Sequence, residues 1–171
     1  MSEFGAGILD EGRMAAQFLV KSAEKLKQGL VQAADYTIAS LERAINFLDK
    51  ISDYNVLSAM TVDQLVELSS VVSSIRQATV EVLISASMSI DPSDPEAMEK
   101  LEKIHKLSVE VIEKSAQAQS MIAITIFAKK MGEHAEDVAE KFGPLGPSPI
   151  VHKDIVESAM KDIERGDFGK P

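Results

Sequence analysis

Cysteine is absent from the 171 residues of the sequence, and so is tryptophan. Without thiols the chain forms no disulfide, no thiolate metal site, no iron–sulfur cluster and no cysteine nucleophile. Aromatic residues make up only 5% of the sequence. A core must therefore be built from Leu, Ile, Val, Ala and Met, which pack well between helices.

Long apolar runs and a basic excess are also missing. The longest uncharged helical stretch, residues 115–128, falls short of the ~20 apolar residues that a membrane-spanning helix needs. The N-terminus has neither a basic region nor a long apolar segment, so no Sec-type signal peptide is expected. We therefore expect the protein to be cytoplasmic, or to be exported without a Sec signal peptide. The chain is acidic, with a formal net charge of −9, and no nucleic-acid partner is expected, because phosphate binding needs clustered Lys and Arg.

The common catalytic motifs are missing as well. The sequence has no Walker A loop, no G-x-G-x-x-G and no G-x-S-x-G elbow. Glu102 and His105 have the Glu-x-x-His spacing of ferritin-like metal sites, but the second pair that such a site needs is absent. A solvated pair on one helix is the preferred interpretation. We expect no enzyme activity, no metal and no cofactor.

Apolar residues at three- and four-residue spacing are abundant, and this pattern predicts helices that each bury one face. A first long helix is predicted over residues 9–52, after a Gly- and Ala-rich arm over residues 1–8. Gly29 costs about 1 kcal/mol relative to Ala inside a helix, so a kink or a close helix crossing is expected there. Residues 52–59 are predicted to form the turn that follows.

The second predicted helix begins with a capping box, because Thr61 is followed three residues later by Gln64. Between residues 68 and 90 the only charged residues are Arg76 and Glu81, whereas a surface helix usually carries more Lys and Glu. We therefore expect this helix to be covered on more than one side. Its heptad positions are Leu65, Leu68, Val72, Ile75, Thr79, Val82 and Ala86.

Residues 91–96, with the sequence DPSDPE, give the strongest local signal in the chain. Pro92 ends the preceding helix, Asp94 caps the next one, and Pro95 occupies its first position. A third long helix is therefore predicted from Pro95 to residue 131.

The C-terminal part of the chain is expected to consist of several short segments. Gly132 allows a break before a short charged helix over residues 133–142, and residues 143–152 form a Pro/Gly connector. An amphipathic helix and tail follow over residues 153–171. The predicted fold is all-α: an elongated antiparallel bundle of three long helices over residues 9–142, plus a short C-terminal helix after the Pro-rich connector.

The low-charge stretches 68–90 and 115–128 are predicted to meet in part across a hairpin. They form an ordinary core, a subunit interface or a membrane-active zone, and the pattern leaves these alternatives open. The last helix packs either on its own bundle or on a neighbouring subunit. The predicted interface residues are Val72, Ile75, Thr79, Val82, Ala118, Ile122, Ile126, Ile155, Met160 and Ile163.

The predicted function is that of a non-enzymatic structural or adaptor protein. It acts through self-association or through docking of a partner helix, so the expected partner is protein and the expected state is a homo-oligomer. The alternative is a membrane-active helical protein, secreted without a leader and similar to an effector or a pore former.

Overall fold

The computed structural model describes residues 2–29, 32–142, 157 and 160–161. These residues form helices and contain no strand, so the predicted all-α fold is confirmed. The helices are α1 (Glu3–Lys27), α2 (Ala33–Ile51), α3 (Tyr54–Ser58), α4 (Val62–Ser89) and α5 (Pro95–Phe142).

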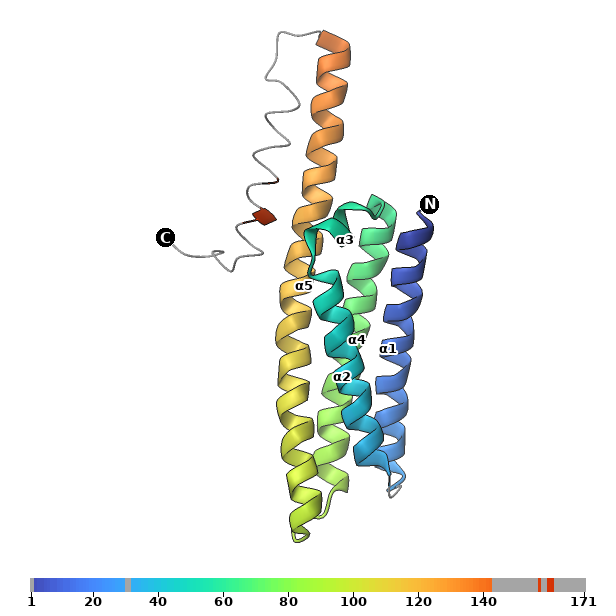
Figure 1. Ribbon diagram of the computed structural model, residues 1–171, viewed down its shortest axis with the longest axis vertical. Helices are drawn as coiled ribbons and strands as arrows, with labels where there is room; N and C mark the ends of the chain where they lie inside the picture. Colours follow the sequence, from blue (N-terminus) through green and yellow to red (C-terminus); the bar gives the residue numbers. More distant parts are fainter. Residues whose placement is uncertain (1, 30–31, 143–156, 158–159, 162–171) are drawn as a thin grey trace, which may run out of the picture.

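Four of these helices pack into an elongated bundle, and the short α3 crosses its upper end (Figure 1). α1 packs against α2 and α4, and α5 packs against the same two helices. Successive long helices alternate in direction, so the neighbours α1 and α4 run parallel, as do the neighbours α2 and α5 (Figure 1). The predicted arrangement of three long helices is therefore wrong, since the bundle has four.

The difference arises at Gly29, where the predicted first helix breaks. Gly29 has a φ of +69°, a left-handed conformation that glycine adopts without the steric cost of a Cβ atom. Its N–H donates to the carbonyl of Leu26 at 3.1 Å, which helps to close the end of α1. The chain then reverses into α2, so the expected kink is a hairpin turn.

The expected loose arm over residues 1–8 is mostly helical. α1 begins at Glu3, and the hydroxyl of Ser2 caps it by accepting from the Gly5 N–H at 3.1 Å. Ile8 is buried in the core. The N-terminal segment is therefore a part of the bundle.

The capping box predicted at the start of α4 is confirmed, and it also holds the start of α1. The Gln64 Oε1 atom accepts from the Thr61 N–H at 3.0 Å, while the Gln64 Nε2 atom donates to the Ser2 carbonyl at 2.8 Å. One buried side chain thus joins the first turns of two parallel helices.

Ion pairs join α1 and α4 at two places along their length. Arg13 pairs with Glu67 at 2.9 Å, and Lys27 pairs with Glu81 at 3.6 Å. Both pairs join residues 54 positions apart, and the second lies 14 residues after the first. Fourteen residues are two heptads, so the two helices advance together.

The other parallel pair, α2 and α5, repeats this pattern. Asp35 pairs with Lys100, and Asp49 pairs with Lys114, again with equal offsets of 65 positions. Hydrogen bonding to Asp49 raises the pKa of Lys114 above its ordinary value. The bundle therefore consists of two hairpins, α1–α2 and α4–α5, that lie side by side in the same orientation.

α5 is a single helix of 48 residues, so the predicted break at Gly132 is wrong. Its predicted start is confirmed, because the Glu96 N–H donates to the Asp94 carboxylate at 3.0 Å. A Cβ atom at Gly132 would meet nothing within 4 Å. The helix thus accommodates one partly exposed glycine at a cost of about 1 kcal/mol and extends beyond the other helices (Figure 1).

The predicted connector over residues 143–152 lies outside the described residues. So does most of the C-terminal segment 153–171, of which Glu157, Met160 and Lys161 are described and helical. Met160 is buried, and its sulfur lies 3.9 Å from the Thr125 hydroxyl of α5.

Two partly exposed aromatic residues brace the first hairpin. The centres of the Phe18 ring of α1 and the Tyr36 ring of α2 are 6.2 Å apart, and each ring contacts a basic side chain. The Arg43 guanidinium lies 4.5 Å from the Phe18 ring, and the Lys25 ammonium lies 5.0 Å from the Tyr36 ring. Such cation–π contacts contribute about 0.5–1 kcal/mol at exposed sites.

The close approach of α1 to its neighbours gives a first prediction. A Cβ atom added at Gly12 would lie 2.6 Å from the Phe47 ring and 2.7 Å from a Val71 methyl carbon. Gly12→Ala should therefore lower the free energy of unfolding by about 1–3 kcal/mol through overpacking. Urea unfolding followed by far-UV circular dichroism measures the change.

Gly7→Ala is the matched control, because Gly7 lies in the same helix with nothing within 4 Å of its Cβ position. This variant should gain about 0.5–1 kcal/mol from helix propensity. Equal stability of the two variants would contradict the close packing of Gly12 against Phe47 and Val71.

Candidate functional site

The low-charge zone predicted as an interface is largely the core of one chain. Six of the ten predicted interface residues are fully buried between the helices of the same molecule. Their side chains are therefore not free to contact a second copy. They are Val72, Ile75, Thr79 and Val82 of α4, and Ala118 and Ile122 of α5.

The remaining four predicted residues belong to the second half of α5 and to the C-terminal segment. Ile126 is partly buried and packs against the core, and Met160 is buried. Ile155 and Ile163 lie outside the described residues. The predicted meeting of residues 115–128 with the first part of α4 is seen, because Gln119 contacts Arg76.

Buried hydroxyl groups are common in this core, but they are mostly satisfied by their own helices. Thr37, Thr79 and Thr125 each donate to the carbonyl four residues earlier, at 2.6–2.7 Å. Such bonds hold the hydroxyl against its own helix backbone. The two histidines that the structure describes, His105 and His134, are both exposed and do not activate these hydroxyls.

The feature that sequence reasoning missed is a second stripe on α4, on the face opposite the core. Seven residues recur at four- and three-residue spacing, and all are at least partly exposed. None of them carries a charge. We call this set the outer stripe: Val66, Ser70, Ser73, Gln77, Val80, Ile84 and Ser87.

Large apolar side chains are concentrated in the second half of the outer stripe. Val80 is 42% exposed and Ile84 is 48% exposed. Met88, which follows the stripe, is 82% exposed. In the described part of the chain nothing covers these three side chains. We call Val80, Ile84 and Met88 the apolar strip of α4.

The contact between α4 and α5 differs from the other helix contacts in its chemistry. The Arg76 Nη1 atom donates to the Gln119 Oε1 atom at 2.6 Å, and the Gln119 Nε2 atom donates to the Ser73 hydroxyl at 2.8 Å. Ion pairs join α1 to α2, α1 to α4 and α2 to α5, but among the described residues none joins α4 to α5. The surface around this contact is therefore low in charge.

A shallow hollow of about 690 Å³ lies over the middle of the outer stripe. Its walls include Gln77 and Val80 of α4, Val20 of α1 and Ile112 of α5. Arg76 and Glu81 stand on opposite sides of it, each next to a different neighbouring helix, because Arg76 contacts α5 and Glu81 contacts α1. The surface of the hollow between these two opposite charges is therefore uncharged.

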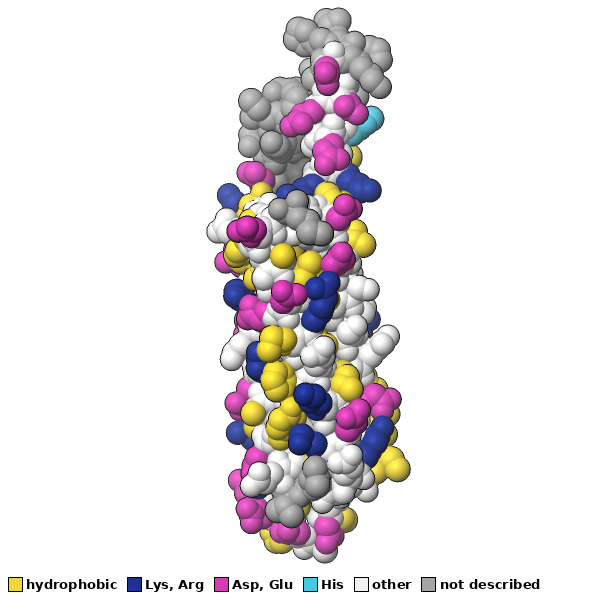
Figure 2. Space-filling view, turned by 90° about the vertical axis from the view of Figure 1, so that its right-hand side faces the viewer, with side chains coloured by type: hydrophobic (Ala, Val, Ile, Leu, Met, Phe, Trp, Pro, Cys, Tyr) yellow, Lys and Arg dark blue, Asp and Glu magenta, His cyan; other side chains and the backbone are white. Residues whose placement is uncertain are grey.

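The surface on the side of α1 has a different composition (Figure 2). Figure 2 shows small groups of hydrophobic side chains separated by acidic and basic ones. The ion pairs of α1 with α2 and α4 account for part of this charge. The outer stripe of α4 is thus unlike an ordinary mixed surface of this protein.

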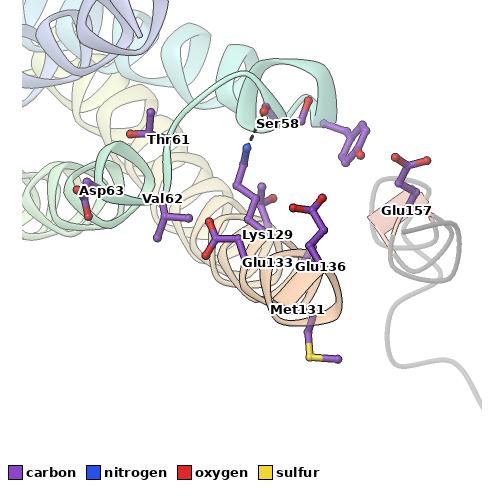
Figure 3. A pocket seen from close by; sticks show the side chains of 13 residues that line it. Ser58, Thr61, Val62, Asp63, Lys129, Met131, Glu133, Glu136 and Glu157 are labelled. Carbon is purple, nitrogen blue, oxygen red and sulfur yellow. Dashed lines mark hydrogen bonds between the residues drawn. The ribbon is translucent and has the colours of Figure 1, made fainter. Parts of the chain in front are cut away.

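A second hollow, of about 750 Å³, lies at the upper end of the bundle between α3, the start of α4 and the extension of α5. Figure 3 shows Lys129 reaching from α5 to the Ser58 carbonyl, with Glu133 and Glu136 farther along the same helix. Asp63 lines its other side. The charged residues that line this hollow are mainly acidic.

Neither hollow holds a metal-binding cluster. Within the described residues, no group of three or more His, Cys, Asp or Glu side chains is placed to hold a metal ion. Glu102 and His105 are exposed on α5, away from both hollows. His152 lies outside the described residues. In the described part of the molecule, no helix has the length and apolar composition needed to cross a bilayer.

Comparison of the chain with protein-family models, with curated proteins and with solved structures found no match to any of them.

The contact of α5 with α3 gives a second prediction. Lys129→Met removes the 2.8 Å hydrogen bond to the Ser58 carbonyl and should lower the free energy of unfolding by about 1 kcal/mol. Lys130→Met is the matched control, because Lys130 is the adjacent exposed residue. It should change stability by less than about 0.5 kcal/mol. Urea unfolding of both variants measures the difference, and equal losses would mean that the Lys129 bond does not stabilise this end of the bundle.

Proposed function

We propose that this chain is a non-enzymatic structural or adaptor protein that self-associates through the outer stripe of α4. The observation that carries the proposal is an exposed, uncharged 3-4 stripe along a helix whose opposite face is already buried in the core. A helix uses such a stripe to pack against another helix.

The distribution of charge supports this function. Charged residues make up 26% of the chain, so a segment of 23 residues with average composition would carry about six. Residues 68–90 carry only Arg76 and Glu81. A surface helix that met only water would normally be rich in Lys and Glu on its exposed side.

The side chains of the outer stripe suit helix packing. Burying a large aliphatic side chain contributes about 1.5–3 kcal/mol relative to full exposure, and Val80 and Ile84 are each about half exposed. The small side chains of Ser70 and Ser73 allow a partner helix to approach closely. α4 has 28 residues, which corresponds to about 42 Å of helix.

The alternative function is contact with a membrane, and one observation favours it. α4 carries uncharged residues on two opposite faces, so an opened bundle would present a helix with few charges around its circumference. The buried hydroxyls of Ser85, Ser108 and Ser115 have no hydrogen-bond partner among the described residues, and hydroxyl residues line helix contacts in membranes. Self-association remains the function we propose, because it needs no opening of the core.

The third prediction tests the surface itself. The protein should sediment as a stable multimer in analytical ultracentrifugation. Ile84→Glu should shift it to the monomer, because it places a charge in the middle of the apolar strip. Met14→Glu is the matched control: Met14 is exposed to a similar degree, 46% against 48%, but lies on α1.

Circular dichroism of both variants confirms that the helices are retained. A wild-type chain that is monomeric over a wide range of concentration would contradict self-association. Dye release from anionic liposomes by the wild-type monomer would instead support the membrane alternative. Dissociation by Met14→Glu alone would place the interface on α1.

A further inference from the structure

We propose that the partner of α4 is α4 of a second copy, packed parallel and in register around a two-fold axis that runs along the helices. This inference rests on the proposed self-association and specifies its geometry. It follows from the identity of the residues in the outer stripe and from the two charges beside it.

The outer stripe has the spacing of the inner positions of a parallel two-stranded coiled coil. Ser70, Gln77 and Ile84 occupy the a positions of successive heptads. The d positions are Val66, Ser73, Val80 and Ser87. Ile84 is the one β-branched residue among these a positions, and a polar residue at an a position can fix register and orientation.

Gln77 is the larger of the two polar residues at a positions, and it lies near the middle of the stripe, in the hollow between the flanking charges. In a parallel pair in register, the two Gln77 side chains meet and their amides can exchange hydrogen bonds. A shift of one helix by one heptad would place Gln77 of one copy against Ile84 of the other, and the second Gln77 against Ser70. The first of these contacts would leave an amide facing an aliphatic side chain. The central glutamine therefore selects the pairing in register.

The flanking charges select the parallel orientation. Arg76 precedes the a position at Gln77 and lies on the α5 side, while Glu81 follows the d position at Val80 and lies on the α1 side. Around a two-fold axis parallel to the helices, the α5 side of one α4 faces the α1 side of the other. Each Arg76 then approaches Glu81 of the second copy, which is the ion pair between positions g and e that sets orientation in coiled coils.

An antiparallel pair brings like charges together instead. Its two-fold axis is perpendicular to the helices, so the α5 sides of both copies meet, and so do their α1 sides. Arg76 would face Arg76, and Glu81 would face Glu81. Neither charge already forms a buried ion pair within its own chain. Glu81 is 58% exposed in its 3.6 Å contact with Lys27, and Arg76 uses one nitrogen for its hydrogen bond to Gln119.

The parallel arrangement also accounts for the most exposed apolar side chain on α4. Met88 lies one heptad after Glu81, and the partly buried Leu83 lies one heptad after Arg76. The same operation that joins Arg76 to Glu81 therefore joins Leu83 of one copy to Met88 of the other. An 82% exposed methionine thus gains an apolar partner.

Single cysteines test the orientation directly, because the chain has none of its own. Ser70→Cys and Ser87→Cys are conservative changes at exposed positions near the two ends of the stripe. Under mild oxidation, each variant alone should form a disulfide-linked dimer in high yield, since equal positions face each other in a parallel pair. Non-reducing gel electrophoresis measures the yield, and Ala39→Cys, exposed on α2, is the control for random collision.

The outcomes separate this inference from the proposed function. Cross-linking only when Ser70→Cys and Ser87→Cys are mixed would show an antiparallel pair and overturn the inference, while self-association stands. A multimer by ultracentrifugation with cross-linking no higher than Ala39→Cys would place the interface elsewhere and overturn the inference too. A monomeric wild-type chain would overturn both.

A charge exchange gives an independent readout. Arg76→Glu and Glu81→Arg should each raise the dimer Kd about tenfold, because each places like charges at both symmetric contacts. The double variant restores opposite charges and should return the Kd close to that of the wild type. Loss of association in the double variant equal to the sum of the single losses would contradict the Arg76–Glu81 pairing, since a purely local effect within one chain is not rescued in this way.

Discussion

The hairpin turn at Gly29 is the constraint on which the rest of the structure depends. Its left-handed backbone ends α1 and reverses the chain, so the first half of the molecule becomes two shorter helices that run side by side. α1 can then lie parallel to α4, and α2 parallel to α5. A continuous helix over residues 9–52 would extend far beyond α4 and leave half of its apolar face uncovered.

This arrangement determines which surface each helix exposes. Every long helix stands at a corner of the bundle, with two neighbours and one outward face (Figure 1). On α1 and α2, the residues beside the outward faces are used for ion pairs such as Lys50 with Glu11. α4 and α5 instead contact each other through Gln119, Ser73 and Arg76. The low charge of this region is thus a property of one helix pair, and the outer stripe lies within it.

Much of the fold could be predicted from the sequence, because its signals are local. The capping box of Thr61 and Gln64 and the start of α5 after Asp94 each depend on a few neighbouring residues. The break at Gly29 could not be predicted with the same security, since the 3-4 pattern continues on both sides of it with only a small shift. Gly132 shows the converse, because an isolated glycine in an exposed helix costs too little to end it.

The candidate surface was predicted only as a low-charge zone, and for a physical reason. α4 carries two 3-4 stripes on opposite faces, and a sequence pattern alone does not say which of them meets the core. The larger residues, such as Leu68 and Ile75, fill the inside, so the predicted interface residues on α4 are core residues. The outer stripe, with Ser70 and Gln77 among its members, has the weaker hydrophobic signal and was overlooked.

The outer stripe also contains residues that do not favour a helix whose outward face meets only water. Serine and valine are weaker helix formers than Ala, Lys or Glu by up to about 0.7 kcal/mol per residue, and Val66, Ser70 and Val80 are exposed. At these positions they add little to the core of their own chain, while they lower the stability of the isolated helix. A second helix against this face would recover that loss through burial of Val80 and Ile84 and through the close approach that serine permits. The stripe therefore makes physical sense as one half of a contact, and the pair of opposite charges beside it supports our proposal that the other half is a copy of itself.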